Sequence, residues 1–482
     1  MKKITFLISI FLFSISVNLY AKSVSKTDEL VLEDLKYFKQ AFEEGYVFYD
    51  DLAKDNNVTL NENKCLKKYN SLKNKKSTDK QGKNIVNGIN QDALLSPLWW
   101  FLKNLNPQDG HLAISTNERD WKITNGTYLY KSDYYFKKEG NDFFLFKCPD
   151  SKLLKQKYTG KIEDLKKTVL NNEEVYVFAP DTKSYIEETK INLNKKITIP
   201  VKYVDMYDEN RSKFKINETE DSIYVKISSF HMVENTKEDL EFMDGLLEIS
   251  DKISEKKNII IDLRNNGGGY NFYTRELVAA IYNKRNSEAE RKEVWEFLHN
   301  AAYGQISLKS NIIAQENYKS AIKNHQSNSI IDSALQELNK QKQINKKYYE
   351  TLYENHFKKL PQFSGKKCNA KIIVLIDNYT ASASEFFITY LYMMDKSNVI
   401  LVGQNSAGIM GGGGRINYEL PNSKLLVSFV TESYKNTAGY LYSPTWKGET
   451  NGFYPDYWVT ENSFFPVLFY LTNDSELKNF KL

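Results

Sequence analysis

The order of apolar and polar residues predicts helices in the first part of the chain. Residues 30–46 carry apolar side chains at helical spacing, and so do residues 91–105. Residues 108–115 are typical of a turn that leads into a strand. We therefore expect residues 22–125 to form a mainly helical region.

The next stretch alternates aromatic and polar residues, as in Asp142-Phe143-Phe144-Leu145-Phe146. A period of two is typical of strands with one buried face. We therefore expect residues 126–218 to form a small β-rich domain. The pattern near residues 162–170 predicts one short helix within it.

From residue 219 the pattern becomes that of an α/β fold. Strands are predicted at residues 222–227 and 258–263, and helices at residues 236–253 and 272–282. Such alternation favours a partly parallel sheet wrapped by helices.

A polar stretch interrupts this α/β pattern at residues 284–360. It is rich in Lys, Asn and Gln and poor in strong strand formers, so we expect a helical insertion. Its charge fits a solvated helical face better than a surface for nucleic acid or for a partner. The α/β pattern resumes at Lys371, so residues 219–482 are expected to be one unit that carries the insertion.

The N-terminus has the features of a secretory signal. Lys2-Lys3 precede an apolar run at residues 4–17, which is short for a membrane span, and Ala21 is a small residue suited to cleavage before Lys22. We expect residues 1–21 to be removed on export. The mature protein would then be periplasmic or secreted, with no stable membrane anchor. An uncleaved N-terminal anchor is the alternative.

Charge and cysteine content narrow the class of function. The chain has 482 residues and a net charge of +5, and its lysines and acids are interspersed, so nothing points to nucleic acid as a partner. Cys65, Cys148 and Cys368 lie far apart, which argues against a disulfide framework but allows one disulfide with one free thiol. We find no zinc-binding spacing and expect no metal and no cofactor.

The most informative motif is D-N-Y-T-A-S-A-S-E at residues 377–385. An apolar strand-like run at residues 372–376 precedes it, and a helix-like run at residues 386–394 follows. A serine at such a turn lies beside the free N–H groups and the positive end of a helix. It can attack a carbonyl there and have the oxyanion stabilised. The alternative is that a hydroxyl of this motif only caps the helix.

A second motif ends the predicted strand at residues 259–263 with Gly267-Gly268-Gly269. Consecutive glycines let backbone N–H groups approach a ligand closely. The motif therefore predicts an oxyanion hole or a clamp on the substrate backbone. A flexible turn is the alternative, and the spacing does not match that of a phosphate-binding loop.

Together the two motifs resemble peptidase family S41, the tail-specific or C-terminal-processing serine peptidases, over residues 219–283 and 370–460. The resemblance implies an α/β crotonase/ClpP-like core with a mixed sheet. It implies that Ser382 is the nucleophile, with Ser384 as the alternative. The amide of Ala383 and a glycine amide, of Gly267 or Gly268, would form the oxyanion hole.

The general base separates two branches of this family. The bacterial processing enzymes use a lysine at a position that Ile409 occupies here, and an apolar side chain cannot accept a proton. The other branch resembles the core of the tricorn protease and uses a histidine from the N-terminal side with a late glutamate. This resemblance implies His111 as base, with His231 as the alternative, and Glu449 as the third member.

Other polar residues near these motifs are expected to support the fold. Gly110 departs from the serine that some relatives carry before the histidine, so the role of that hydroxyl is lost. Glu432 and Asp456 are alternative carboxylates, although Asp456 fits a role in fixing its turn. Asp262 and Arg264 are expected to hold the strand-to-turn geometry.

The resemblance implies an exported serine peptidase that hydrolyses peptides or proteins through an acyl-enzyme. Many relatives carry a PDZ domain where residues 126–218 lie, but these residues lack a convincing carboxylate-binding loop, so a degenerate PDZ-like domain is only one reading. The alternative function is a catalytically silent member that binds peptides or a protein. Retention of Ser382, His111 and Glu449 argues against it.

Overall fold

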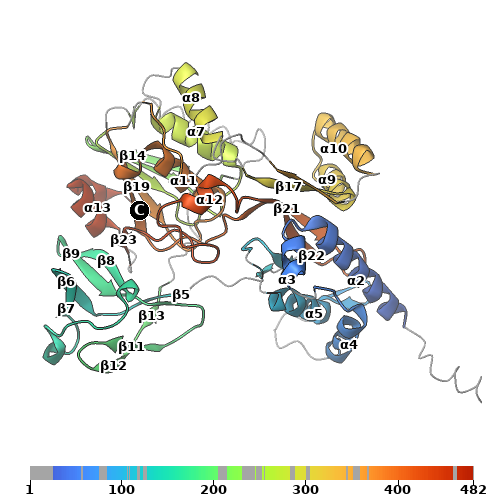
Figure 1. Ribbon diagram of the computed structural model, residues 1–482, viewed down its shortest axis with the longest axis horizontal. Helices are drawn as coiled ribbons and strands as arrows, with labels where there is room; N and C mark the ends of the chain where they lie inside the picture. Colours follow the sequence, from blue (N-terminus) through green and yellow to red (C-terminus); the bar gives the residue numbers. More distant parts are fainter. Residues whose placement is uncertain are drawn as a thin grey trace, which may run out of the picture.

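A computed structural model describes most of the chain (Figure 1). The described residues are 25–55, 58–74, 84–105, 107, 109–116, 120–122, 128–204, 214–230, 245, 252–253, 256–282, 288–299, 304–342, 346–350, 359–365, 368–459 and 464–480. The predicted signal segment and His231 lie outside these residues, as does nearly all of the helix predicted at residues 236–253.

The core is a mixed sheet with the strand order β14-β15-β16-β19-β20-β23. Only the β14–β15 pair is antiparallel, and the other neighbours are parallel, as the predicted α/β alternation requires. The strands are β14 (Phe214–Glu218), β15 (Ser222–Ile227), β16 (Asn258–Asp262), β19 (Lys371–Ile376), β20 (Val399–Gly403) and β23 (Tyr457–Trp458).

Helices cover both faces of this sheet because alternate side chains of each strand point to opposite faces. One face packs against α7 (Asn271–Tyr282), α8 (Glu288–His299) and α11 (Ala383–Asp395). The other face packs against α13 (Phe465–Thr472). Every residue of β16 is buried, which explains its continuous apolar sequence.

A second sheet joins the N-terminal region to the core, with the order β18-β17-β22-β3-β4 and β21 paired to β22. Its strands are β3 (Ala113–Ser115), β4 (Asp120–Lys122), β17 (Ile306–Lys309), β18 (Lys347–Glu350), β21 (Gly412–Glu419) and β22 (Leu426–Ser433). The insertion contains α8, α9 (Asn311–Lys323) and α10 (Asn328–Gln341), but also β17 and β18. The prediction of helix alone was therefore incomplete, because β17 becomes a strand by pairing with distant β22.

The N-terminal region contains the two helices predicted from apolar spacing, here α2 (Lys26–Gly45) and α5 (Gln91–Asn104). In the C-terminal part, α12 (Ala438–Tyr442) contacts α11 instead. Around α2 and α5 lie α3 (Tyr49–Asp55), α4 (Glu62–Leu72), β1 (Ile85–Val86) and β2 (Ile89–Asn90). These helices share a core with β22 and α9, so this region and the peptidase-like core are built together.

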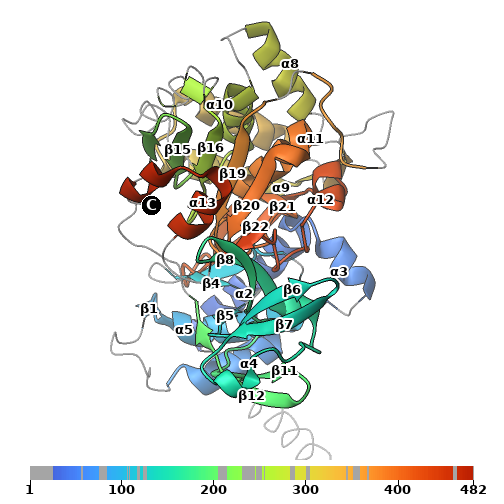
Figure 2. The same cartoon turned by 90° about the vertical axis from the view of Figure 1, so that its left-hand side faces the viewer.

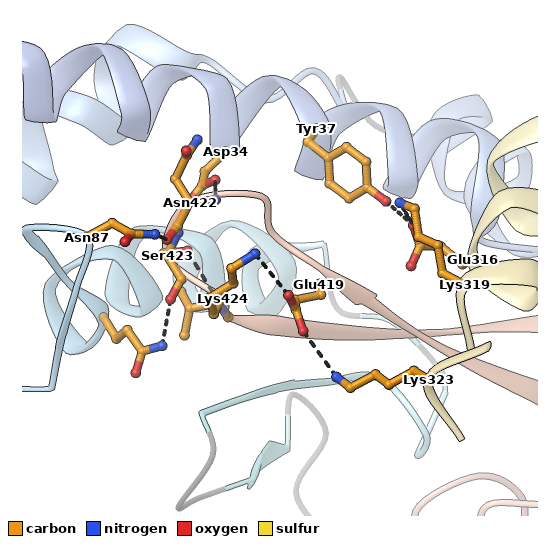
Figure 3. Close-up of polar contacts among 12 residues, drawn as sticks. Asp34, Tyr37, Asn87, Glu316, Lys319, Lys323, Glu419, Asn422, Ser423 and Lys424 are labelled. Carbon is orange, nitrogen blue, oxygen red and sulfur yellow. Dashed lines mark hydrogen bonds and ion pairs between the residues drawn. The ribbon is translucent and has the colours of Figure 1, made fainter. Parts of the chain in front are cut away.

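Polar contacts fasten α2 to the turn between β21 and β22 (Figure 3). The buried carboxylate of Asp34 accepts hydrogen bonds from the backbone N–H groups of Asn422 and Ser423, both at 2.8 Å. One turn further along α2, the Tyr37 hydroxyl donates to Glu316 of α9 at 2.5 Å. The insertion and the turn therefore both bind the same helix.

The β-rich region contains a sheet of order β7-β6-β9-β8 and shorter pairings (Figure 2). Its strands are β5 (Tyr128–Lys131), β6 (Tyr135–Glu139), β7 (Asp142–Lys147), β8 (Leu165–Leu170), β9 (Glu173–Phe178), β10 (Asp181–Thr182), β11 (Glu188–Asn192), β12 (Lys196–Pro200) and β13 (Lys202–Tyr203). The predicted helix near residues 162–170 was wrong beyond its first turn, a 3-10 turn at Ile162–Asp164. Residues 165–170 extend because they pair with β9, and Thr168 donates to the Trp458 carbonyl of the core.

The structure also bears on disulfides and on membrane-spanning helices. Cys65, Cys148 and Cys368 are all free thiols, so the disulfide left open by the sequence is not formed. Within the described residues, no helix has the length and apolar character needed to span a bilayer.

Candidate active site

Ser382 lies at the turn between β19 and α11, where the sequence motif placed it. Its backbone has φ of +55° and ψ of −116°, which residues other than glycine rarely adopt. The carboxylate of Asp377 stabilises the turn by accepting the N–H groups of Tyr379 and Thr380, both at 3.0 Å. A strained serine held at a helix N-terminus is typical of an exposed nucleophile.

Glu385 fixes the other side of this turn, and the sequence analysis gave it no role. Its buried carboxylate accepts the backbone N–H of Ser382 at 3.0 Å. It also accepts the N–H groups of Gly408 and Ile409, both at 2.9 Å, and the Ser406 hydroxyl at 2.5 Å. Burial raises the pKa of Glu385, and these hydrogen bonds oppose the rise. The spacing Ser-x-x-Glu of a capping box was the signal that could have identified it.

His111 approaches Ser382 from the N-terminal region. Its Nε2 atom lies 3.3 Å from the Oγ atom of Ser382, although 271 residues separate them in sequence. The His111 side chain is only 12% exposed. The structure therefore brings Ser382 and His111 together at the short distance that a nucleophile and its base require.

Asp109 is the carboxylate next to His111, and the sequence analysis did not select it. Its Oδ1 atom accepts the backbone N–H of His111 at 2.9 Å and lies 3.5 Å from the Nδ1 atom. Asp109 is 1% exposed. The hydroxyl of buried Tyr46 lies close by, and burial together with the Asp109 charge raises the pKa of Tyr46 well above its usual value. The nearby phenol is therefore a neutral potential donor to this carboxylate.

Gly110 and Ile409 pack closely against each other. A Cβ atom on Gly110 would lie 1.6 Å from the Cγ2 atom of Ile409, so the isoleucine fills the space that a side chain before His111 would need. Ile409 thus occupies the position of the lysine base and packs against the histidine turn. This arrangement fits a histidine base, because the apolar side chain of Ile409 cannot accept a proton.

The glycine loop lies directly against the nucleophile. Gly268 has φ of +97°, and a Cβ atom there would be 2.8 Å from both the Ala383 nitrogen and the Ser382 Cβ atom. The N–H of Gly268 donates to the side chain of Asn266 at 2.9 Å. In the described part of the chain, the N–H groups of Gly267 and Ala383 have no such acceptor. These two amides remain available for an oxyanion.

Neighbouring residues hold this loop and exclude the alternative nucleophile. Arg264 binds Asp262 through two hydrogen bonds, of 2.9 and 2.6 Å, and both side chains are buried, as expected for a structural pair. Ser384 is fully buried, and its hydroxyl donates to the Asn266 carbonyl at 3.1 Å. Ser384 therefore points away from His111, and Ser382 is the better candidate.

Glu449 lies behind Asp109 rather than against His111. Its Oε1 atom accepts the N–H of Gly411 at 2.5 Å, and no hydrogen bond joins it to His111 among the described residues. Burial, and then the negative charge of Asp109, raise the pKa of Glu449 well above its usual value. Loss of its proton is therefore less favourable than for a free glutamate. The role of Glu449 in orienting His111 stays a prediction.

The loop that carries Glu449 is fastened to the β-rich region. The Nζ atom of Lys183 donates to the Thr450 hydroxyl at 2.9 Å and to the Asn451 side chain at 3.1 Å.

Asp456 forms two hydrogen bonds with Leu401 of β20. Its N–H donates to the Leu401 carbonyl at 2.8 Å, and its carboxylate accepts the Leu401 N–H at 2.9 Å, so it fixes its turn as expected. The described residues contain no group of three His, Cys, Asp or Glu side chains that could hold a metal.

The sequence is similar to that of a known family of peptidases. Residues 221–457 match the model of peptidase family S41. The chain belongs to peptidase family S41. This match confirms the predicted resemblance and the predicted fold class, and it makes the chain a serine-type peptidase. No curated protein matches the chain in a sequence search.

Several solved structures are similar to this S41 peptidase. Mature CPAF complexed with lactacystin is 13% identical, with 93% of this chain and 100% of that chain covered and a TM-score of 0.39. The photosystem II D1 C-terminal processing protease is 11% identical, with coverages of 90% and 93% and a TM-score of 0.31. The tricorn protease is 14% identical, with coverages of 94% and 36% and a TM-score of 0.33.

Proposed function

We propose that this S41 peptidase is an exported enzyme that cleaves peptide bonds through an acyl-enzyme on Ser382. The observation that carries the proposal is the 3.3 Å approach of His111 Nε2 to the Oγ atom of Ser382. A serine hydroxyl is a weak nucleophile near neutral pH, and an imidazole at this distance can take its proton as the hydroxyl attacks.

In the proposed reaction, Ser382 Oγ attacks the scissile carbonyl while His111 Nε2 removes the hydroxyl proton. The amide of Ala383 and an amide of the glycine loop receive the oxyanion at the positive end of α11. His111 then gives its proton to the leaving amine. Water hydrolyses the resulting ester with His111 again as the base.

We propose that the buried carboxylate of Asp109 orients His111 and stabilises its protonated form. It holds the backbone N–H of His111 at 2.9 Å and lies 3.5 Å from Nδ1, whereas Glu449 is bonded to Gly411. In this proposal Glu449 lies near Asp109 as a neutral acid, so that it adds no second negative charge beside the Asp109 carboxylate. This assignment uses two carboxylates in different protonation states.

The central test is digestion of a diverse peptide library, read by mass spectrometry. The wild type should cleave and Ser382→Ala should not. Ser384→Ala is the matched control, since Ser384 is buried on the Asn266 carbonyl and should be dispensable for chemistry. A phosphonate that labels active serines should modify Ser382 alone. Cleavage by Ser382→Ala would refute the assignment.

Export has a separate test. The full chain, expressed in a bacterial host, should yield an exported form that begins at Lys22. Retention of the full N-terminus in the membrane fraction would favour the uncleaved anchor instead. Cleavage of peptides does not depend on this outcome.

A further inference from the structure

A groove outside the active site is lined mainly by residues of α4 and α5 in the N-terminal region. These two helices lie side by side (Figure 1). Its volume is about 710 Å³, which is within the usual range of binding sites. Buried Leu60 and Cys65 are among its lining residues. None of the residues that surround Ser382 lines it.

One side of the groove is basic. Lys64, Lys67 and Lys68 line it from α4, and we call these three residues the basic wall. Their spacing of i, i+3 and i+4 places them on one face of the helix. All three are exposed, and none forms an ion pair with another described residue. The one acid of α4, Glu62, lies 3.8 Å from Lys39 instead. The positive charge of this wall is therefore not neutralised by the described part of the fold.

The opposite side is apolar and aromatic. Pro97, Trp100 and Phe101 line it from α5 with the same i, i+3 and i+4 spacing, and we call them the aromatic wall. Trp100 is 54% exposed, which is unusual for so large an apolar side chain. Its ring lies edge-on to Trp99 at 5.2 Å, so it is supported in place. Exposed tryptophans with such support are typical anchors of protein interfaces.

We propose that this groove binds an acidic peptide segment that also carries large apolar side chains. Acidic side chains would pair with the basic wall, and apolar side chains would cover Trp100 and the aromatic wall. Each wall runs from residue i to i+4, which is about one helical turn, or about 6 Å, and matches the length of about two extended residues. The half-exposed tryptophan favours a peptide over a small ligand, because pockets for small ligands bury most of their occupant.

The test uses Ser382→Ala protein, so that the probe is not cleaved. A short fluorescent peptide of alternating glutamate and leucine should bind and raise its anisotropy. Binding should weaken by about 10-fold or more when the basic wall is changed to glutamine, or in Trp100→Ala. A matched peptide with glutamine in place of glutamate should bind by about the same factor more weakly.

The control variant changes Lys190, Lys195 and Lys196 to glutamine, which removes the same charge from exposed positions around the β11–β12 hairpin. It should bind the acidic peptide as well as the parent protein does. Equal binding of both peptides, or unchanged binding by the basic-wall variant, would overturn the proposal. A second assay uses an apolar dye bound in the groove. Displacement of the dye by the fatty acid laurate, but not by the acidic peptide, would also overturn the proposal. Melting curves check that each variant is folded, and wild-type cleavage of unrelated peptides tests the peptidase separately.

Discussion

Replacing Asp109 by asparagine is the sharpest test of the proposed base. The substitution keeps the size of the side chain and an oxygen that can still accept the backbone N–H of His111, now at 2.9 Å. It removes only the negative charge that lies 3.5 Å from the Nδ1 atom. The turn should therefore persist while the protonated imidazole loses its counter-charge.

The size of the effect follows from this distance. Two unit charges 3.5 Å apart interact by about 5 kcal/mol at an effective dielectric constant of about 20. His111 gains its charge only as the reaction proceeds, so most of this energy belongs to the transition state. We therefore expect kcat/KM of Asp109→Asn to fall by about three orders of magnitude.

Glu449→Gln is the companion variant. The raised pKa of Glu449 favours its neutral form, which the substitution imitates, so kcat/KM should fall by less than about 10-fold. Both variants are assayed with one quenched peptide substrate, with melting temperature as the check on folding. Equal losses in the two variants, or full activity in Asp109→Asn, would refute the assignment of Asp109 and return the role to Glu449.

The same glutamate predicts a dependence of stability on pH. Because its pKa is raised, the folded protein holds the proton more tightly than the unfolded chain does. This stabilisation is complete below the unfolded pKa of about 4.3 and is lost as the pH rises toward the folded value. The Tm of Glu449→Gln relative to wild type should therefore increase as the pH rises above about 4. Parallel curves would contradict the raised pKa.

Three further substitutions test the surroundings of the site. Gly268→Ala should lower kcat by about 100-fold or more in a folded protein, because its Cβ atom would lie 2.8 Å from the Ala383 nitrogen; activity near wild type would contradict this. Gly110→Ala should destabilise the protein by about 1–3 kcal/mol in urea unfolding, and adding Ile409→Ala should reverse part of the loss; additive losses would contradict the contact. Asp34→Ala should lower the free energy of unfolding by about 3 kcal/mol, since it leaves the N–H groups of Asn422 and Ser423 without their acceptor. An unchanged midpoint of urea unfolding would contradict this.

Periodicity predicted the elements whose burial is decided locally. The core strands β15, β16 and β19 and the helices α2, α5, α7 and α11 all lie where the apolar pattern placed them. The misses were segments whose conformation depends on distant partners. Residues 165–170 became a strand by pairing with β9, and residues 306–309 by pairing with β18 and, at residues 306 and 307, with β22. Tertiary pairing overrides local preference in such segments.

The site residues also fall into those that the sequence pattern reveals and those that depend on the fold. The motif around Ser382 was visible because the turn, the serine and the helix are contiguous in sequence. Asp109 was overlooked although it lies two residues before His111, since its value as a partner depends on a turn that folds its carboxylate back onto the histidine. Glu385 was quoted as part of a motif, but its bonds to Gly408 and Ile409 arise only in the fold.

The contacts of Ile409 show why the base cannot be assigned from one position alone. Its side chain cannot accept a proton, yet that fact alone would equally suit an inactive relative. Its side chain, however, occupies the space above Gly110, and its N–H is held by the carboxylate of Glu385 that also holds Ser382. The residue that replaces the lysine thus links the histidine turn to the nucleophile turn. That link supports the proposed role of His111, because it holds the histidine turn against the turn that carries the nucleophile.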